Sequence, residues 1–577
     1  MEIKRKILII ITSIIMVLFI WHNFLVTGNN VIFIFIFLAS YNILKALSKI
    51  NNKRAKNTAR IIAIIYSVIQ IICRSINTDF TLNNIINKWT LINFIGYYII
   101  AWSLITWLYN WFDTKEFKVF KKLENAKIMN KPVILFCIIF ALIFLAWLPY
   151  FLRYYPGIVT SDSYSQIEQM IGKIQLQNHH PITHTAIIGI FVNIGLALTN
   201  DINFGIALYS IASMVIMAIF NTCVLMYLRK KQVPQFLQII LLLYYMFYPV
   251  NAMYSITMWK DILFSGIIPI FIILNIELIF NTQNYLEKKR NILLYVLIAV
   301  FTILLKHNGL YVVILTLPFV FIVLRKYWKK ILPMFLSIIV IYELTNILFY
   351  NVLNIEKGSV IEALSIPVQQ IARVEKNHRT QLDEETKNSI DKFFKVENIG
   401  DLYNPILSDP VKWNMNENYF KDNKIEFLQL WFKLVFKYPK DCIESFLSNS
   451  YGYYYPEAFS GVVSRATMDH NLGIQQQPKI KGQLVEKLDS LTENRDIPVV
   501  SMMFSIGFAF WLMITCLGYK IYKKQYKYIL IYIPVIVLWL TCVASPVNCE
   551  FRYAYALFTT LPIFVCLNHI QNKENLE

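Results

Sequence analysis

One acidic residue, Asp162, stands among amides and histidines in a polar stretch of an otherwise apolar sequence. Residues 153–185 read RYYPGIVTSDSYSQIEQMIGKIQLQNHHPITHT, and the neighbouring candidate side chains are Gln166, His179, His180 and His184. A carboxylate in this company could deprotonate a hydroxyl or an amine. It could also hold a divalent cation, Mg²⁺ or Mn²⁺, with His179 or His180. The alternative is a helix N-cap at this position beside interfacial histidines.

Three shorter constellations place cations at the ends of apolar runs, and two of them also contain an acid. They are MWKD with Lys260 and Asp261, KHNG with Lys306 and His307, and CEFRY with Glu550 and Arg552. A phosphate would neutralise the four basic side chains, and Arg binds phosphate oxygens with a bidentate fork. Asp261 is a second candidate catalytic carboxylate, and Glu550 is a candidate substrate or metal ligand. The alternatives are a structural ion pair within MWKD, a pairing of Glu550 with Arg552 within CEFRY, and snorkelling of Lys306.

The composition places these residues in a membrane protein. The 577 residues are 56% hydrophobic and only 16% charged, with a mean hydropathy of +0.48. Apolar runs of roughly 17 to 22 residues recur, which is about the length that crosses a bilayer as a helix. We therefore expect an all-α polytopic membrane protein with about 14 transmembrane helices. They are predicted near residues 7–26, 31–47, 61–78, 91–112, 133–152, 205–228, 236–256, 261–280, 292–305, 310–324, 331–350, 501–519, 528–545 and 553–569.

The net charge of +19 does not indicate nucleic acid, because the basic residues occur in short clusters between apolar runs. This is the positive-inside pattern of a plasma-membrane protein. The clusters lie at residues 45–60, 115–131, 229–231, 288–290, 325–330 and 520–527. All of them face the cytoplasm if residues 186–198 form a re-entrant or interfacial helix of roughly a dozen residues, which is short for a span.

The resulting organisation has four parts. Residues 1–130 form an N-terminal four-helix extension, and 131–350 form a transmembrane core with a first outside loop at 153–204. Residues 351–500 form an extracytoplasmic α or α+β domain, in which Gln370 and Arg373 could bind a sugar or an acceptor or merely belong to the scaffold. Residues 501–577 form three C-terminal membrane helices. Both termini are then cytoplasmic, and the candidate site residues face outward.

The order of these features resembles the C-type glycosyltransferase superfamily over roughly residues 131–569. The wording DSxxQ...NHHPxxHT, with PVQQIAR and EFRYA later, looks closer to a bacterial family of uncharacterised polytopic proteins often grouped with these transferases. In characterised superfamily members the acid of the first outside loop is catalytic, and its match here is Asp162. The acid of the second turn matches Asp261. Four additional N-terminal spans and the doubled histidine before Pro181 depart from the better-known members.

The resemblance implies transfer of a sugar from a polyprenyl-phosphate donor to a cell-envelope glycan, lipid or protein, with inversion. The donor's leaving group is already anionic, so the site needs cations more than a general acid. A polysaccharide polymerase or ligase would use the same donors. A transporter or flippase, and a non-enzymatic scaffold, are alternatives from other classes. The absence of a GxxxxGK[ST] or GxGxxG loop argues against an ATP-driven pump.

Overall fold

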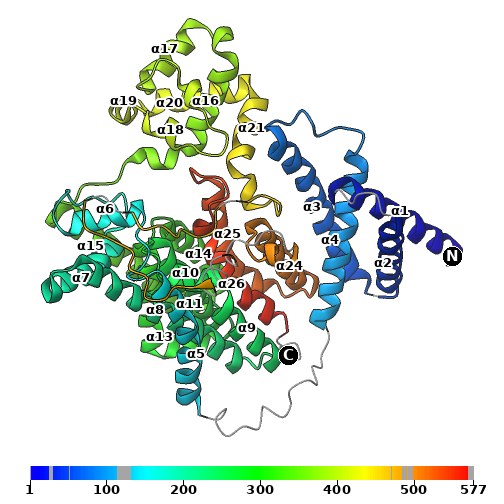
Figure 1. The fold of residues 1–577 in the computed structure, drawn as a ribbon, viewed down its shortest axis with the longest axis horizontal. Coiled ribbons are helices and arrows are strands. Elements are labelled where there is room, and N and C mark those ends of the chain that lie inside the picture. The colour runs from blue at the N-terminus through cyan, green and yellow to red at the C-terminus, as the bar shows by residue number, and fades with distance from the viewer. Residues whose placement is uncertain are drawn as a thin grey trace.

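The computed structural model describes residues 2–24, 30–50, 52–113, 131–459, 461–468, 471–483, 490 and 498–569. Within these ranges the regular structure is helical, and β pairing is confined to isolated bridges. Figure 1 shows one large bundle, a group of N-terminal helices beside it and a small helical domain above. The described part of the chain is thus all-α. Most of the predicted basic cluster at 115–131 lies outside the described residues.

The N-terminal helices stand together at one side of the bundle (Figure 1). Asn52 caps α3 by accepting from the Ala55 amide, and the side chain of Asp113 at the end of α4 accepts from Tyr519 and Tyr522 of α24. These last bonds tie the N-terminal group to the C-terminal helices. The bounds are α1 Glu2–Phe24, α2 Asn30–Ser48, α3 Lys53–Asp79 and α4 Thr90–Asp113.

The central bundle begins with α5, which Pro132 starts because a first-turn residue needs no amide donor. The chain breaks before Pro249, and the two helices on either side of the break, α9 and α10, are bent by 50° relative to each other. The bounds are α5 Pro132–Arg153, α6 Ser161–Met170, α7 Ile182–Thr199, α8 Ile202–Lys230, α9 Gln235–Phe247, α10 Pro249–Ser255, α11 Lys260–Phe280, α12 Thr282–Glu287, α13 Lys289–Leu305, α14 Asn308–Val323 and α15 Trp328–Ile347. The C-terminal helices are α23 Pro498–Met502, α24 Ile506–Tyr522, α25 Ile529–Val543 and α26 Phe551–Leu567.

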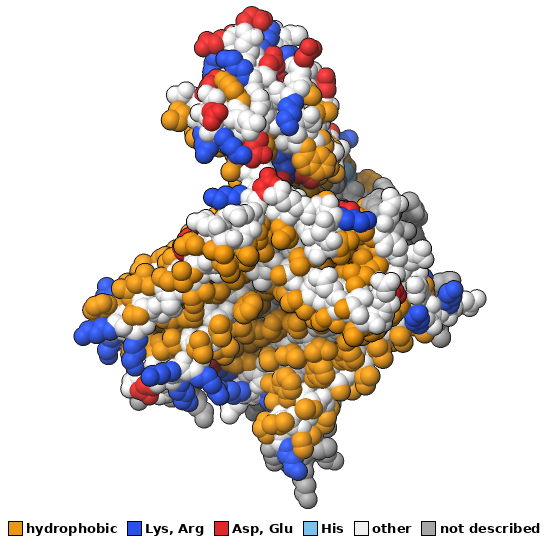
Figure 2. Space-filling view, turned by 90° about the vertical axis from the view of Figure 1, so that its left-hand side faces the viewer, with side chains coloured by type: hydrophobic (Ala, Val, Ile, Leu, Met, Phe, Trp, Pro, Cys, Tyr) orange, Lys and Arg blue, Asp and Glu red, His pale blue; other side chains and the backbone are white. Residues whose placement is uncertain are grey.

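Among the described residues, 8 helices are long and apolar enough to cross a membrane, or up to 9 if α9 and α10 form one bent span. Several other predicted spans coincide with shorter apolar helices, such as α14, α24 and α26. Figure 2 shows the broad hydrophobic surface of the bundle, with Lys and Arg side chains along its lower edge. A polytopic membrane protein is the architecture that this surface requires, since so large an apolar area is not left in water.

The two ends of the bundle are distinguished by the residues that they carry. At one end, which we call the basic end, Lys231, directly after α8, pairs with Glu277 of α11, and Lys520 of α24 donates to the last carbonyl of α26. At the other end, which we call the Asp162 end, Asp162 meets Arg552 and Asn308 of α14 donates to Thr541 of α25. The predicted clusters at 229–231 and 520–527 therefore share one end, and the candidate site lies at the other.

Helix α7 leaves the Asp162 end and the first turns of α8 bring the chain back. His184 near the start of α7 contacts the Tyr209 hydroxyl of α8, and Asn200 makes the turn with φ +53°. The chain therefore returns to its starting level before α8 crosses to the basic end. Helix α7 has 18 residues, so the predicted length of about a dozen was wrong. By length and composition alone it qualifies as a span.

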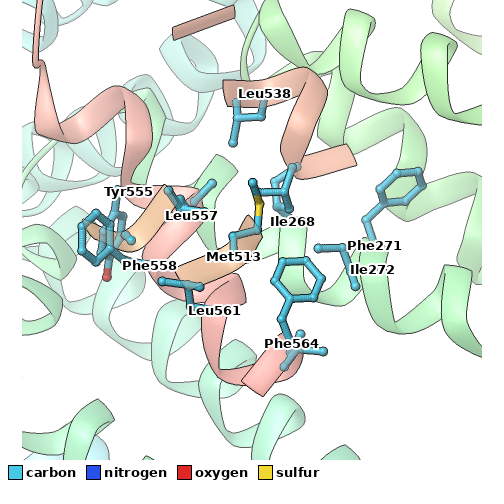
Figure 3. Packing of buried hydrophobic residues seen from close by; sticks show 14 of the residues in the cluster. Ile268, Phe271, Ile272, Met513, Leu538, Tyr555, Leu557, Phe558, Leu561 and Phe564 are labelled. Atoms are coloured by element: carbon cyan, nitrogen blue, oxygen red, sulfur yellow. The ribbon is translucent and has the colours of Figure 1, made fainter. Parts of the chain in front are cut away.

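The bundle is held by apolar packing between its last helices and α11. Figure 3 shows Ile268 and Ile272 of α11 facing Met513 of α24 and residues of α26. Phe564 of α26 stacks on Tyr532 of α25 with ring centroids 4.2 Å apart. Helix α26 is buried along almost its whole length, so Arg552 in its first turn is fixed against the bundle.

The domain above the Asp162 end has its own hydrophobic core, formed by residues such as Val368, Ile371, Phe393 and Phe427. It rests on the bundle through backbone bonds such as Ser408 N to Pro546 O at 2.8 Å. Its described helices are α16 Ser365–His378, α17 Glu384–Phe393, α18 Asp409–Trp413, α19 Glu417–Asp422, α20 Lys424–Lys437 and α21 Pro439–Ser450. No strand occurs in its described part, which leaves the α alternative of the two that the sequence allowed.

Candidate functional site

Helix α6 places Asp162 beside the start of α11. Thr160 and Ser163 form a capping box, so the helix begins at Ser161 and Asp162 lies in its first turn. Just before it, the Ile158 amide donates to Ile256 O at 2.9 Å and Ile158 O accepts from the Met258 amide at 3.0 Å. This parallel pairing aligns the two loops, so Asp162 and Lys260 lie close together.

Two cations from distant segments meet the Asp162 carboxylate. Arg552 Nη1 donates to Asp162 Oδ2 at 2.9 Å, and Lys260 Nζ lies 3.6 Å from the same oxygen. The Asp162 side chain remains 23% exposed, and those of Lys260 and Arg552 are each 17% exposed. All three side chains of the cluster are therefore partly exposed.

Aromatic rings fix the Arg552 guanidinium. Its centre lies 4.9 Å from the ring of Trp259 and 5.2 Å from that of Tyr553. Trp259 is itself oriented by the bond from its Nε1 to Thr160 Oγ1, at 2.7 Å. Glu550 adds a second carboxylate, with Oε1 3.1 Å from Arg552 Nε. The planar cation therefore lies over two rings and also contacts two carboxylates.

Lys306 and Asp261 form a separate, deeper ion pair. Lys306 Nζ donates to Asp261 Oδ1 at 2.5 Å, and the side chains are 7% and 0% exposed. Lys306 Nζ also lies 5.0 Å from the ring centre of Tyr553, next to Arg552 in α26. The structure thus places Asp261 where it neutralises Lys306, and not on the open side with Asp162.

His180 connects Lys260 to the loop that follows α6. Lys260 Nζ donates to His180 Nδ1 at 2.8 Å, so this ring nitrogen accepts and is unprotonated. Burial and the nearby Lys260 ammonium lower the pKa of His180 to about 3. A neutral imidazole here positions the Lys260 ammonium without adding charge.

The two carboxylates on Arg552 differ in their proton affinity. Burial alone would raise the pKa of Asp162, but Lys260 and Arg552 outweigh it and hold the pKa well below its usual range. For Glu550 burial dominates, and the pKa is raised although Arg552 opposes the shift. Asp162 is therefore ionised in this arrangement, and Glu550 holds a proton more readily.

Gln166 and His184 form a buried structural network. Gln166 Nε2 donates to Thr185 Oγ1 at 2.8 Å, and the two ring nitrogens of His184 contact Gln166 Oε1 at 3.1 Å and the Tyr209 hydroxyl at 2.9 Å. Because both side chains are satisfied by protein groups, they join α6, α7 and α8 and leave little capacity for a ligand.

His179 and His307 lie at the rim of the cluster. His179 stacks edge to face on His180 and is 4.0 Å from Glu362 of the helical domain. His307 Nε2 lies 3.1 Å from Asn178 O and thereby ties the turn before α14 to the loop before α7. Both are exposed enough to meet a ligand that approaches from the domain side.

Gln370 and Arg373 do not join the cluster. In α16, Gln370 Nε2 donates to Cys442 O at 3.0 Å, and Trp431 Nε1 donates to Gln370 Oε1 at 2.6 Å. Arg373 donates to Glu444, whose other oxygen accepts from the Leu82 amide. These two residues therefore hold the domain together and secure it to the loop after α3.

A divalent cation does not fit the predicted ligands. Lys260 Nζ lies between the Asp162 carboxylate and the His180 ring, so a cation would meet a like charge there. Across the described residues, no three His, Cys, Asp or Glu side chains gather as a metal site would require. No step of a mechanism at this cluster is therefore assigned to a metal.

An extended segment beside the site was missed by sequence reasoning. Met468 N donates to Val159 O at 2.9 Å, and Gln477 N donates to Tyr155 O at 2.7 Å, so residues 461–468 and 471–483 follow the loop that leads into α6. Asn203 at the start of α8 binds Gly473 O and the Gln475 amide. Glycines and mixed polarity gave no periodic signal that would predict this path.

The aromatic residues around Arg552 were also missed as site residues. Trp259 and Tyr553 are adjacent to Lys260 and Arg552 in sequence, and this adjacency was the available signal. A Trp or Tyr at the end of a span is common in membrane proteins for interfacial reasons alone, so the type of residue does not reveal the stacking.

Comparison with known proteins identifies a family for this chain but assigns it no activity. No curated protein and no solved structure matches the chain. A family described as "Family of unknown function (DUF6020)" matches residues 172–576, which include Lys260, Lys306 and Arg552 but not Asp162. Since this match covers more than half of the 577 residues, the chain belongs to the DUF6020 family.

Proposed function

We propose that this protein is a membrane glycosyltransferase that moves a sugar from a polyprenyl-phosphate donor to an acceptor outside the cytoplasmic membrane. The observation that carries the proposal is the partly exposed carboxylate of Asp162 held against Arg552 and Lys260. A base and two phosphate-binding cations at one end of a hydrophobic bundle suit an anionic lipid whose head reacts and whose tail stays in the bilayer.

The proposed topology agrees with this assignment. It has about fourteen crossings, namely α1–α5, α8, α9 with α10, α11, α13–α15 and α24–α26, with both termini cytoplasmic. Support comes from the location of the 229–231 and 520–527 clusters at the basic end, opposite Asp162. The site then faces outward, where nucleotide sugars are absent and a lipid-linked donor is needed.

In the proposed reaction the acceptor hydroxyl oxygen forms a bond to the anomeric carbon of the sugar. The bond from that carbon to the phosphate oxygen breaks, and polyprenyl phosphate leaves with the electron pair. The hydroxyl proton passes to the Asp162 carboxylate, while Arg552 and Lys260 stabilise the charge on the leaving phosphate. In-line displacement inverts the anomeric configuration.

The test is a transfer assay in lipid nanodiscs with a panel of radiolabelled polyprenyl-phosphate hexoses and pentoses and cell-envelope acceptors. We expect the wild type to consume one donor and Asp162→Asn to lose about 10²- to 10⁴-fold in rate, the usual contribution of a general base. Asp422→Asn, an exposed carboxylate in the helical domain, is the matched control and should keep the wild-type rate.

Two outcomes would contradict the proposal. One is an Asp162→Asn protein that is as active as the wild type. The other is a wild type that consumes no donor of the panel with any acceptor. Product size separates a monosaccharide transferase from a polymerase or ligase, because only the latter extends or transfers preassembled glycans.

A further inference from the structure

Each Lys and Arg side chain that was predicted to bind a phosphate already contacts a carboxylate of the same chain. Arg552 contacts Asp162 and Glu550, Lys260 contacts Asp162, and Lys306 contacts Asp261. The groups that would bind a phosphate are therefore occupied by acids. A ligand phosphate must displace at least one of these acids before it can contact a cation.

We propose that the donor phosphate displaces Asp162 from Arg552, and that this exchange converts Asp162 from a counter-ion into the base. The inference rests on the proposed function and adds its regulation: the base is inactive until the donor is bound. An enzyme so arranged does not activate an acceptor, or water, in an empty site.

Exposure and geometry select Arg552 as the place of exchange. Lys306 is only 7% exposed and its partner Asp261 is fully buried, so that pair has no free side for a ligand. Arg552 and Asp162 are 17% and 23% exposed. The rings of Trp259 and Tyr553 hold the guanidinium in place, so one oxygen acceptor can replace another without movement of the cation.

The exchange changes the chemistry of Asp162. Arg552 and Lys260 are the groups that overcome the effect of burial on this carboxylate. Once the phosphate takes Arg552, burial and the new negative charge both favour the protonated form, and the carboxylate becomes a stronger base. Lys260, which also contacts His180, remains to hold the carboxylate near the reacting centre.

Binding of a non-reactive donor mimic tests the exchange. The probe is geranyl methyl phosphate, a soluble diester that carries one charge between pH 5 and 8 and has no sugar to transfer. If Asp162 competes for Arg552, then Asp162→Asn should bind the probe at least about fivefold more tightly than the wild type, the lower end of ordinary coupling between sites. Asp422→Asn removes the same charge elsewhere and should bind like the wild type.

A second measurement follows the protons that are taken up on binding. Calorimetry at pH 5.5 in two buffers of different ionisation enthalpy should show that the wild type takes up protons when it binds the probe. The diester itself does not titrate there, so the protons belong to the protein. Asp162→Asn should take up fewer protons than the wild type under the same conditions.

The outcomes separate the inference from the proposed function. Unchanged or weaker binding by Asp162→Asn, or wild-type binding without proton uptake, overturns the exchange but leaves a transferase with an ordinary base. No binding of the probe by any of the three proteins overturns both, because no phosphate would then be recognised. Tighter binding by Asp162→Asn together with its loss of transfer supports both.

Discussion

At the scale of single residues, Arg552 contacts two carboxylates, and their surroundings shift the pKa values of the two groups in opposite directions. The pKa of Asp162 is lowered because Lys260 and Arg552 outweigh its burial, and the pKa of Glu550 is raised because burial outweighs Arg552. The difference follows from the number of cations that each carboxylate contacts: Asp162 contacts both Lys260 and Arg552, whereas Glu550 contacts Arg552.

These opposite shifts predict opposite effects on stability. A carboxyl group with a lowered pKa stabilises the fold at pH values above about 4, which is the pKa of an ordinary carboxyl group. This stabilisation is lost as the pH falls below that value. Asp162→Asn should therefore lower the Tm at pH 7.5 and by nearly as much at pH 4, because this stabilisation is lost only as the pH falls further toward the lowered pKa. A carboxyl group with a raised pKa destabilises the fold at pH values at which the group must ionise. Glu550→Gln should therefore raise the Tm at pH 7.5 and leave it unchanged at pH 4.

Thermal unfolding of the detergent-purified proteins, followed by intrinsic fluorescence, measures both effects. Asp422→Asn again serves as the control and should give the wild-type Tm at both pH values. Shifts of the same sign in Asp162→Asn and Glu550→Gln would contradict the assigned electrostatics.

The buried pair of Lys306 and Asp261 predicts a different result. Loss of one partner leaves a charge without compensation in an apolar surrounding, which costs about 3 to 5 kcal/mol. Asp261→Asn and Lys306→Met should each lower the Tm strongly, whereas the double variant should recover much of the loss. Glu277→Gln, in a more exposed pair with Lys231, should have a smaller effect. A double variant less stable than both single variants would argue against this pairing.

At the scale of elements, α7 and α8 approach each other backbone to backbone. A Cβ at Gly195 would lie 2.3 Å from backbone atoms of Gly205, and a Cβ at Gly205 would lie 2.7 Å from the Val192 Cα. Backbone atoms cannot move aside as a side chain can. This hairpin also positions His184 against α6 through Gln166, so its spacing affects the site.

Gly195→Leu should force α7 away from α8. We expect a lower Tm and weaker binding of geranyl methyl phosphate, because α6 and Asp162 lose their support from α7. Gly461→Leu is the control, since a Cβ at this position meets no atom within 4 Å. Equal stability of the two variants, measured by thermal unfolding in detergent, would show that α7 and α8 do not pack this closely.

At the scale of the whole molecule, the helical domain and the candidate site share one end of the bundle, and basic clusters occupy the other. Basic residues remain cytoplasmic during insertion. Membrane-impermeant maleimide added to intact cells should therefore label Glu385→Cys in the domain but not Lys289→Cys near the basic end. Cys137, the exposed native cysteine, is first replaced by serine. If only Lys289→Cys were labelled, the orientation of the protein in the membrane would be opposite to the one proposed.

Much of the architecture follows from the sequence because hydrophobicity is a local property. An apolar run indicates that a segment lies in the bilayer, and basic residues beside it indicate which end stays in the cytoplasm. Helices such as α5 and α11 can therefore be predicted from composition. The length of α7 was not readable, because its first turn, which contains His184, is polar in type but buried through contacts with α6 and α8.

The composition of the candidate site was only partly predictable. Residue types singled out Asp162, Lys260 and Arg552, yet the ion pair between the first and the last joins positions 390 residues apart. Such contacts depend on which helices pack together, and packing is decided by shape complementarity over the whole bundle rather than by any local pattern.

The sequence by itself determined that this chain is a helical membrane protein with its unusual polar residues between apolar runs, because burial preference is encoded residue by residue. Only the tertiary structure decided which of those residues meet. It brought Asp162, Lys260 and Arg552 into one cluster, enclosed Asp261 with Lys306, and kept Gln370 and Arg373 inside the domain. The physical reason is that a charge in an apolar surrounding needs a partner, and the fold determines which partner is within reach.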